Sequence, residues 1–253
     1  MSLPAPDDAV HDAGPDPEGL RGQRQLAILT DNGLRPDHDL LDIGCGNGRL
    51  AYECAGYLDG GSYTGIDVSR PAIDWLREHY AGERTDLHFD HLDVHSPKYQ
   101  KTAEQAADSV RFPYDDASFD YVCSFAVFMH MFPPEIGHYF DETRRVLRPD
   151  GRALFTIPIV FDPDDPPATR GGVGPRPVPI GDGVWAPAEG HQASMAFDRD
   201  LIAALVAAAG LHVARFMPHI LGAGKSLSFD RHDAAGGDAL ILQLGPPDVP
   251  ATW

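Results

Sequence analysis

Three glycines, Gly44, Gly46 and Gly48, are the residues with the clearest chemical potential. They lie in the stretch LLDIGCGNGRLAYECAG, between an apolar, strand-like segment and a helix-like segment. Glycine has no side chain, so a ligand can approach the backbone closely there. The first N–H groups of the following helix attract a negatively charged group such as a carboxylate. The stretch therefore predicts a turn that holds a small ligand.

A carboxylate follows at a spacing that suits a nucleoside. Asp67 lies 19 residues after Gly48, where the strand-like part of YTGIDVS ends. Its side chain can accept two hydrogen bonds from a ribose diol, and Ile66 and Val68 can flank an adenine ring. We therefore expect the ligand to contain adenosine.

Two kinds of adenosine cofactor compete for this pattern. A dinucleotide fingerprint would be G-x-G-x-x-G, whereas here the third glycine comes one residue early, as G-C-G-N-G followed by Arg49. This spacing favours S-adenosylmethionine, whose methionine tail takes the place of a pyrophosphate.

Strand and helix patterns alternate around these residues. A first helix runs from Leu20 to the Asn32-Gly33 stop. Strands are predicted near 39–43, 62–67, 86–90, 118–124, 151–158, 211–220 and 238–244, and helices near 48–58, 70–81, 134–147 and 197–209. Such alternation predicts an α/β fold with a parallel sheet and helices on both faces.

Four ordered motifs resemble those of class I S-adenosylmethionine-dependent methyltransferases of the small-molecule type. After the glycine motif come FDHLDV (Phe89–Val94), RFPYDDASFDYVCSFAVFMHM (Arg111–Met131) and RRVLRPDGRALFTIP (Arg144–Pro158). The resemblance covers residues 40–158. It implies a Rossmann-like, doubly wound, seven-stranded sheet in the order 3-2-1-4-5-7-6 with the last strand antiparallel.

The resemblance also implies the residues that bind the cofactor. Asp42 and the turn would hold the methionine end, Asp67 the ribose, and Asp93 with the Val94 backbone the adenine. The full set is Asp42, Gly44, Cys45, Gly46, Gly48, Arg49, Asp67, Val68, Asp93, Val94, Ser124 and Phe125. One departure is an insertion of about 15 residues, SPKYQKTAEQAADSV at 96–110, which leaves open what closes over the adenine.

Two histidines are candidate general bases for removing a proton from an acceptor hydroxyl. His130 follows the fourth predicted strand, and His191 lies in the Pro-rich stretch APAEGHQ beside Glu189. Weaker candidates nearby are Glu135, His138, His232 and Asp233, with Phe128, Phe132 and Trp185 as possible pocket aromatics, although capping and core packing explain several of them equally well.

Two other motifs have a simpler interpretation. HLDVH places His91, Asp93 and His95 at alternate positions, which could bind a metal, but Asp93 already has the adenine role, so no metal is expected. LGAGKS at 221–226 lacks the first glycine of a phosphate loop because His219 stands there, so a connecting loop is expected.

Composition excludes several classes of partner. The net charge of −18 repels nucleic acid and anionic lipid, and no apolar run is long enough to span a bilayer. Three cysteines indicate no disulfide framework, which fits a reducing, cytoplasmic location. Residues 1–19 are expected to form a disordered or loosely attached arm, and 20–253 a methyltransferase domain with a Pro/Gly-rich, lid-like insertion at 158–192.

The sequence therefore predicts transfer of a methyl group from S-adenosylmethionine to a small molecule, at a hydroxyl of a sugar, polyketide or similar metabolite. Methyl transfer to nitrogen, a nicotinamide-dependent oxidoreductase and a non-catalytic S-adenosylmethionine-binding protein stay open as alternatives. The oligomeric state is not predicted.

Overall fold

The computed structural model describes residues 3–11, 16, 19–96, 99–161, 177–187, 195–218 and 238–247. Contacts divide the described residues into two compact units. The first comprises Met1–Ala106, Phe112–Phe125 and Val146–Arg152. The second comprises Ala107–Arg111, Ala126–Arg145 and Ala153–Trp253.

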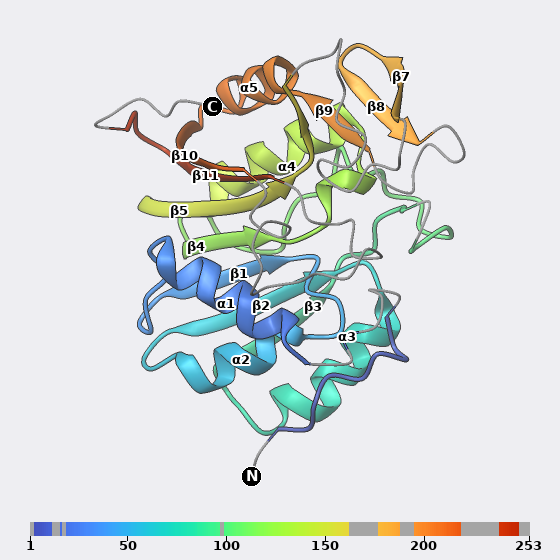
Figure 1. The fold of residues 1–253 in the computed structure, drawn as a ribbon. Coiled ribbons are helices and arrows are strands. Elements are labelled where there is room, and N and C mark those ends of the chain that lie inside the picture. The colour runs from blue at the N-terminus through green and yellow to red at the C-terminus, as the bar shows by residue number, and fades with distance from the viewer. Residues whose placement is uncertain are drawn as a thin grey trace. The chain divides into compact units, whose positions relative to one another are not determined.

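A seven-stranded sheet has the order β3-β2-β1-β4-β5-β11-β10 (Figure 1). β1 pairs in parallel with β2 and β4, β2 pairs in parallel with β3, and β10 pairs antiparallel with β11. The predicted Rossmann-like order is therefore confirmed. The strands are β1 (Asp39–Ile43), β2 (Ser62–Asp67), β3 (Leu87–His91), β4 (Phe119–Ser124), β5 (Leu147–Ile157), β10 (His212–Met217) and β11 (Asp238–Gln243).

The first unit carries the turn between β1 and the next helix. Leu40, Leu41 and Ile43 of β1 are buried, because this strand lies between β2 and β4 in the sheet. Its helices are α1 (Arg21–Asp31), α2 (Arg49–Tyr57) and α3 (Arg70–Leu76), and α3 continues as a π-helical turn, Arg77–Ala81. These bounds agree with the helices predicted from the sequence.

Helices α1 and α2 approach each other closely at Gly22. A methyl group placed on this residue would lie 2.2 Å from the carbonyl oxygen of Arg49. No side chain fits into that distance. A glycine in the first turn of α1 is therefore what allows this helix to pack on the start of α2.

In the second unit an aromatic cluster supports helix α4 (Pro133–Val146). The ring of Phe128 packs against Phe140, with 5.6 Å between ring centroids, and against Phe155 of β5, with 4.9 Å. All three rings are buried. Pro133 occupies the first position of the helix, where its fixed φ is favourable and its missing N–H costs no helical hydrogen bond.

A second, four-stranded sheet has the order β6-β9-β8-β7, and Figure 1 labels β7, β8 and β9 of this sheet. Its strands are β6 (Ile159–Val160), β7 (Pro177–Gly181), β8 (Val184–Pro187) and β9 (Ala196–Asp198), and helix α5 (Arg199–Ala208) follows. The sequence predicted a lid-like insertion at 158–192 and no strand within it, whereas β6, β7 and β8 lie in this range.

Long-range pairing explains these strands. The β7–β8 hairpin turns through Gly181 and Gly183, both with positive φ, and the indole N–H of Trp185 donates to the carboxylate of Asp198 at 2.7 Å. β7 is an edge strand, the place in a sheet that tolerates proline. The strand propensity of residues 158–192 could not show that strands in this range pair with residues 196–198.

Other element bounds differ by a few residues. β5 begins at Leu147, earlier than the predicted 151, and α5 begins at Arg199 because Ala196–Asp198 pairs as β9. Within the described ranges, no helix combines the length and the apolar composition that crossing a bilayer requires.

Candidate cofactor site

The glycine turn has the backbone geometry that the sequence predicted. Gly44, Gly46 and Gly48 have φ values of 78°, 55° and 83°, a region that disfavours residues with a Cβ atom. The backbone N–H groups of Gly44 and Cys45 both donate to the carbonyl oxygen of Ile66, at 2.8 and 3.1 Å. The turn is therefore fixed to the end of β2.

Asp67 holds the middle of the same turn. Its Oδ2 accepts a hydrogen bond from the backbone N–H of Gly46 at 2.8 Å, and its Oδ1 accepts one from the N–H of Ser69 at 2.7 Å. A carboxylate offers about four acceptor positions. Asp67 can thus accept hydrogen bonds from a ribose diol in addition to these two.

The glycines of this region have different neighbours. A methyl group on Gly48 would lie 2.3 Å from the Leu76 side chain, and one on Gly65 would lie 2.8 Å from the Cys45 sulfur, so these two glycines allow tight core packing. The three atoms nearest to a methyl group on Gly46 would all belong to the ring of His11, the first of them at 3.1 Å. The face of Gly46 that lacks a side chain is therefore turned away from the core.

Asp42 lies beneath the turn and is only 3% exposed. Its Oδ2 accepts a hydrogen bond from the Tyr63 hydroxyl at 2.6 Å, and its Oδ1 lies 3.5 Å from the Cys123 thiol. Burial raises the pKa of this carboxyl to about 6, although the two hydrogen bonds oppose the shift. A direct contact of Asp42 with the methionine end stays a prediction.

The predicted adenine segment follows β3. Asp93 is exposed and Val94 is buried, and the N–H of Leu92 donates to the carbonyl oxygen of Asp67 at 2.9 Å. This hydrogen bond joins the segment to the end of β2, beside half-buried Val68.

His91, the first of the two alternate histidines of this segment, has protein partners. The ring nitrogens of His91 lie 3.1 Å from the Val68 carbonyl oxygen and 3.0 Å from the Arg70 guanidinium. Across the described ranges, no cluster of three or more His, Cys, Asp or Glu residues could hold a metal ion.

The end of β4 supplies two further predicted residues. Ser124 is buried, and its hydroxyl donates to the carbonyl oxygen of Ile43 at 2.9 Å, which joins β4 to the residue preceding the glycine turn. Phe125 is buried directly after it. The predicted cofactor residues all belong to the first unit.

Each catalytic candidate either belongs to the second unit or lies outside the residues that the structure describes. His130 is half-buried at the end of a 3₁₀ turn, Phe128–His130, and its backbone N–H donates to Val127. His191 lies outside the described residues, as do Glu189, His232, Asp233 and the LGAGKS segment.

The weaker candidates in the second unit have structural contacts. Glu135 caps α4 by accepting the N–H of Phe132 at 2.6 Å, and a ring nitrogen of His138 contacts the carbonyl oxygen of Val110. Phe128 belongs to the aromatic core, whereas Phe132 is 37% exposed. Trp185 is buried in β8.

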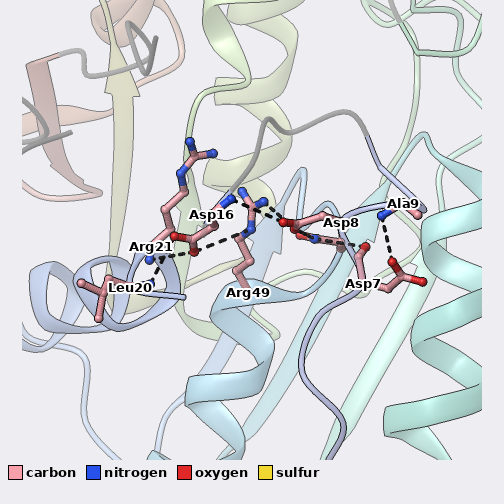
Figure 2. Close-up of polar contacts among 8 residues, drawn as sticks. Asp7, Asp8, Ala9, Asp16, Leu20, Arg21 and Arg49 are labelled. Atoms are coloured by element: carbon pink, nitrogen blue, oxygen red, sulfur yellow. Dashed lines mark hydrogen bonds and ion pairs between the residues drawn. The ribbon is translucent and has the colours of Figure 1, made fainter. Parts of the chain in front are cut away.

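Sequence reasoning missed the N-terminal residues that contact the turn (Figure 2). The Arg49 guanidinium donates to Asp8 at 2.7 Å and lies 3.9 Å from Asp16. The Asn47 side chain, within the turn, also donates to Asp8, at 2.8 Å. Acidic residues in the N-terminal segment are the only sequence signal, and acidic residues are too abundant in this chain to single these out.

The site fits a ligand made of an adenosine and an amino-acid tail. A left-handed glycine turn leaves one backbone face bare, Asp67 provides acceptors at the neighbouring strand end, and α2 begins at the turn with N–H groups that favour a carboxylate. No basic side chain other than Arg49 stands in this turn, so a pyrophosphate would find less complementary charge there.

Comparisons with known proteins agree with this geometry. Residues 41–155 match a family model described as "Methyltransferase domain". Over 119 residues the chain is 36% identical to 27-O-demethylrifamycin SV methyltransferase of Amycolatopsis mediterranei (strain S699), an alignment that covers 47% of this chain and 38% of that protein. Over 148 residues it is 32% identical to nocamycin O-methyltransferase of Saccharothrix syringae, covering 58% and 45%.

The chain thus spans less than half the length of these two relatives. Among solved structures, the PH0226 protein from Pyrococcus horikoshii OT3 superposes with a TM-score of 0.57 at 18% identity, over 94% of this chain and 95% of that one. At this identity the likeness shows a shared fold.

Proposed function

Because residues 41–155 form a class I S-adenosylmethionine-dependent methyltransferase domain, we propose that this protein transfers a methyl group to a hydroxyl of a small molecule. The observation that carries the proposal is the glycine turn held to the end of β2 by Asp67, at the carboxyl ends of neighbouring parallel strands. Open parallel sheets bind their ligands at that edge.

The main cofactor-binding residues each have a proposed role. Asp67 accepts the ribose diol, the Gly44–Gly48 turn with Asp42 and the start of α2 holds the methionine end, and Asp93 with the Val94 backbone contacts the adenine. Cys45, Arg49, Val68, Ser124 and Phe125 complete the cofactor-binding set. S-adenosylmethionine supplies a methyl group on a sulfonium, so the main demand on the protein is to hold the acceptor oxygen in line at about 3–3.5 Å.

Two observations support a small acceptor. The field of a chain with net charge −18 opposes nucleic acid. Both relatives described above are named for small molecules, and both names specify transfer to oxygen. A hydroxyl acceptor must lose its proton, and we propose His130 or His191 as the base that accepts it.

Calorimetric titration with S-adenosylmethionine and with S-adenosylhomocysteine tests the cofactor first. Wild-type protein should bind both in the micromolar range, and Asp67→Ala should abolish binding. Asp90→Ala is a matched control, because this carboxylate lies on the neighbouring strand β3 and pairs at 3.1 Å with Arg77. Absence of wild-type binding to either ligand would remove the proposal, and titration with the nicotinamide dinucleotides would then test the oxidoreductase alternative.

A panel of hydroxyl-bearing and amine-bearing acceptors tests the reaction. Methylated product from a hydroxyl acceptor is the expected result, and product only from amines would shift the assignment to nitrogen. Tight cofactor binding without product from any acceptor would favour the non-catalytic alternative. With a productive acceptor, His130→Ala and His191→Ala decide the base, and wild-type turnover in both variants would exclude both residues from that role.

A further inference from the structure

The first residues of the chain dock on the glycine turn. The carbonyl oxygen of Pro4 accepts a hydrogen bond from the Tyr80 hydroxyl at 2.9 Å. The Asn47 side chain donates to the carbonyl oxygen of Asp7 at 3.3 Å and to the carboxylate of Asp8 at 2.8 Å. Asn47 stands between Gly46 and Gly48, so these contacts fix the N-terminal segment to the turn itself.

An ion pair strengthens this docking. Figure 2 shows the contact of the Arg49 guanidinium with the Asp8 carboxylate, which lies 2.7 Å away. The Arg49 side chain is only 10% exposed. Burial acts to raise the pKa of Asp8, but the hydrogen bond and the charge of Arg49 outweigh it, so this pKa lies below its ordinary value. The N-terminal segment is therefore held by a charged contact at the first residue of α2.

His11 lies over the bare face of Gly46. Its Cδ2 and Nε2 atoms lie 3.1 and 3.3 Å from the position that a methyl group on Gly46 would occupy. The imidazole also stacks on the ring of Tyr99, with 5.2 Å between centroids and 15° between planes. Tyr99 comes from the insertion at 96–110, so two segments outside the family motifs meet beside the turn.

One polar atom of this arrangement has no hydrogen-bond partner among the described residues. The Nδ1 of His11 is buried and has no hydrogen-bond partner within the part of the chain that the structure describes. Buried polar atoms are nearly always paired, because an unpaired one loses its hydration without compensation. A polar group of a ligand seated at Gly46 would provide the missing partner.

We propose that His11 is a cofactor-binding residue: its Nδ1 hydrogen-bonds S-adenosylmethionine, and the segment Asp7–His11, stacked on Tyr99, stays closed over the cofactor at the glycine turn. This inference rests on the proposed function. The N-terminal segment and the insertion would then form one wall of the cofactor site. The opposite arrangement, in which His11 fills the place of the cofactor and must leave when it binds, is an outcome of the test.

Titration of full-length variants with S-adenosylhomocysteine tests the hydrogen bond. His11→Ala should raise the Kd about five- to tenfold, as expected for the loss of one hydrogen bond and a ring contact. His11→Asn, which keeps a polar atom near the Nδ1 position, should recover part of this loss, whereas His11→Phe, which keeps only the stack, should not. His88→Ala, an exposed histidine of β3, is the matched control and should bind like wild type.

The three outcomes are distinguishable. Wild-type affinity in His11→Ala, or full recovery by His11→Phe, would overturn this inference and leave the proposed function standing. Tighter binding by His11→Ala would show that the ring competes with the cofactor and would also overturn it. If wild-type protein binds no S-adenosylhomocysteine, the proposed function and this inference fall together.

Hydrogen–deuterium exchange tests closure independently of affinity. With saturating S-adenosylhomocysteine, the peptide that contains residues 5–11 should exchange about tenfold more slowly than without it, and Asp8→Asn should reduce this protection because it weakens the contact with Arg49. Unchanged or faster exchange of this peptide in wild-type protein, together with measured ligand binding, would refute a segment that closes over the cofactor.

Discussion

Replacing Asp42 by asparagine should remove a pH dependence of folding stability. The carboxyl of Asp42 is enclosed by the protein, and this burial raises its pKa from 3.8 to about 6, against the hydrogen bonds from Tyr63 and Cys123. Asparagine has nearly the same shape and can still accept the hydrogen bond from Tyr63 but does not ionise. The Asp42→Asn variant therefore isolates the cost of burying the charge.

The sign and size follow from linkage. The folded protein binds the proton of Asp42 more strongly than the unfolded chain, so the stabilisation is fully present below about pH 3.8 and is lost as the pH rises through about 6. The rise of this pKa from 3.8 to about 6 corresponds to about 3 kcal/mol of stabilisation in full, of which about 2 kcal/mol is present at about pH 4.5. At neutral pH the Asp42 carboxyl of the wild type is ionised, and the whole stabilisation is lost.

Urea unfolding between about pH 7.5 and about pH 4.5 measures the effect. The free energy of unfolding of wild type, relative to Asp42→Asn, should rise by about 2 kcal/mol as the pH falls across this range. Asp37→Asn is the control, because its carboxyl is exposed and its hydrogen bond with Arg35 lowers the pKa below 3.8, so its difference from wild type should stay nearly constant across this range. Parallel pH profiles of wild type and Asp42→Asn would refute the reasoning.

Three further predictions concern packing around the same unit. Gly22→Ala should destabilise the fold by about 2 kcal/mol in the same urea assay, because the new Cβ would clash with the Arg49 carbonyl oxygen. Gly56→Ala is the control: this helical glycine has open space around it, and its replacement should stabilise the fold by about 0.5–1 kcal/mol. Equal effects of the two substitutions would contradict the close contact between α1 and α2. Tyr63→Phe should raise the pKa of Asp42 further and cost about 1–3 kcal/mol at neutral pH, measurable as a steeper pH profile than wild type. The three thiols are buried, and burial raises their pKa values, so Ellman's reagent should react with them only in urea. Rapid labelling of the native protein would contradict this prediction, because it would show that the thiols are accessible in the folded state.

Local patterns in the sequence identified most of the first unit. The strand at 39–43, the glycines after it and the acid at Asp67 are close in sequence, and each follows from a short-range preference: apolar periodicity, positive φ or the end of a strand. The strand order followed from a resemblance carried by these motifs. The second sheet escaped prediction because β6 and β8 are defined by pairing with β9, and the prolines around them conceal any strand pattern.

The sequence by itself determined the alternation of strands and helices, the glycine turn and the acidic residue that follows it, since each of these depends on neighbouring residues. Only the tertiary structure decided that Asp42 is buried against Tyr63 and Cys123, and that the N-terminal segment lies on the turn with His11 above Gly46. These contacts join residues separated by 21 to 81 positions along the chain. The energies of these contacts depend on how deeply the groups are buried and how far apart they lie, and both are determined only by the packing of the folded chain.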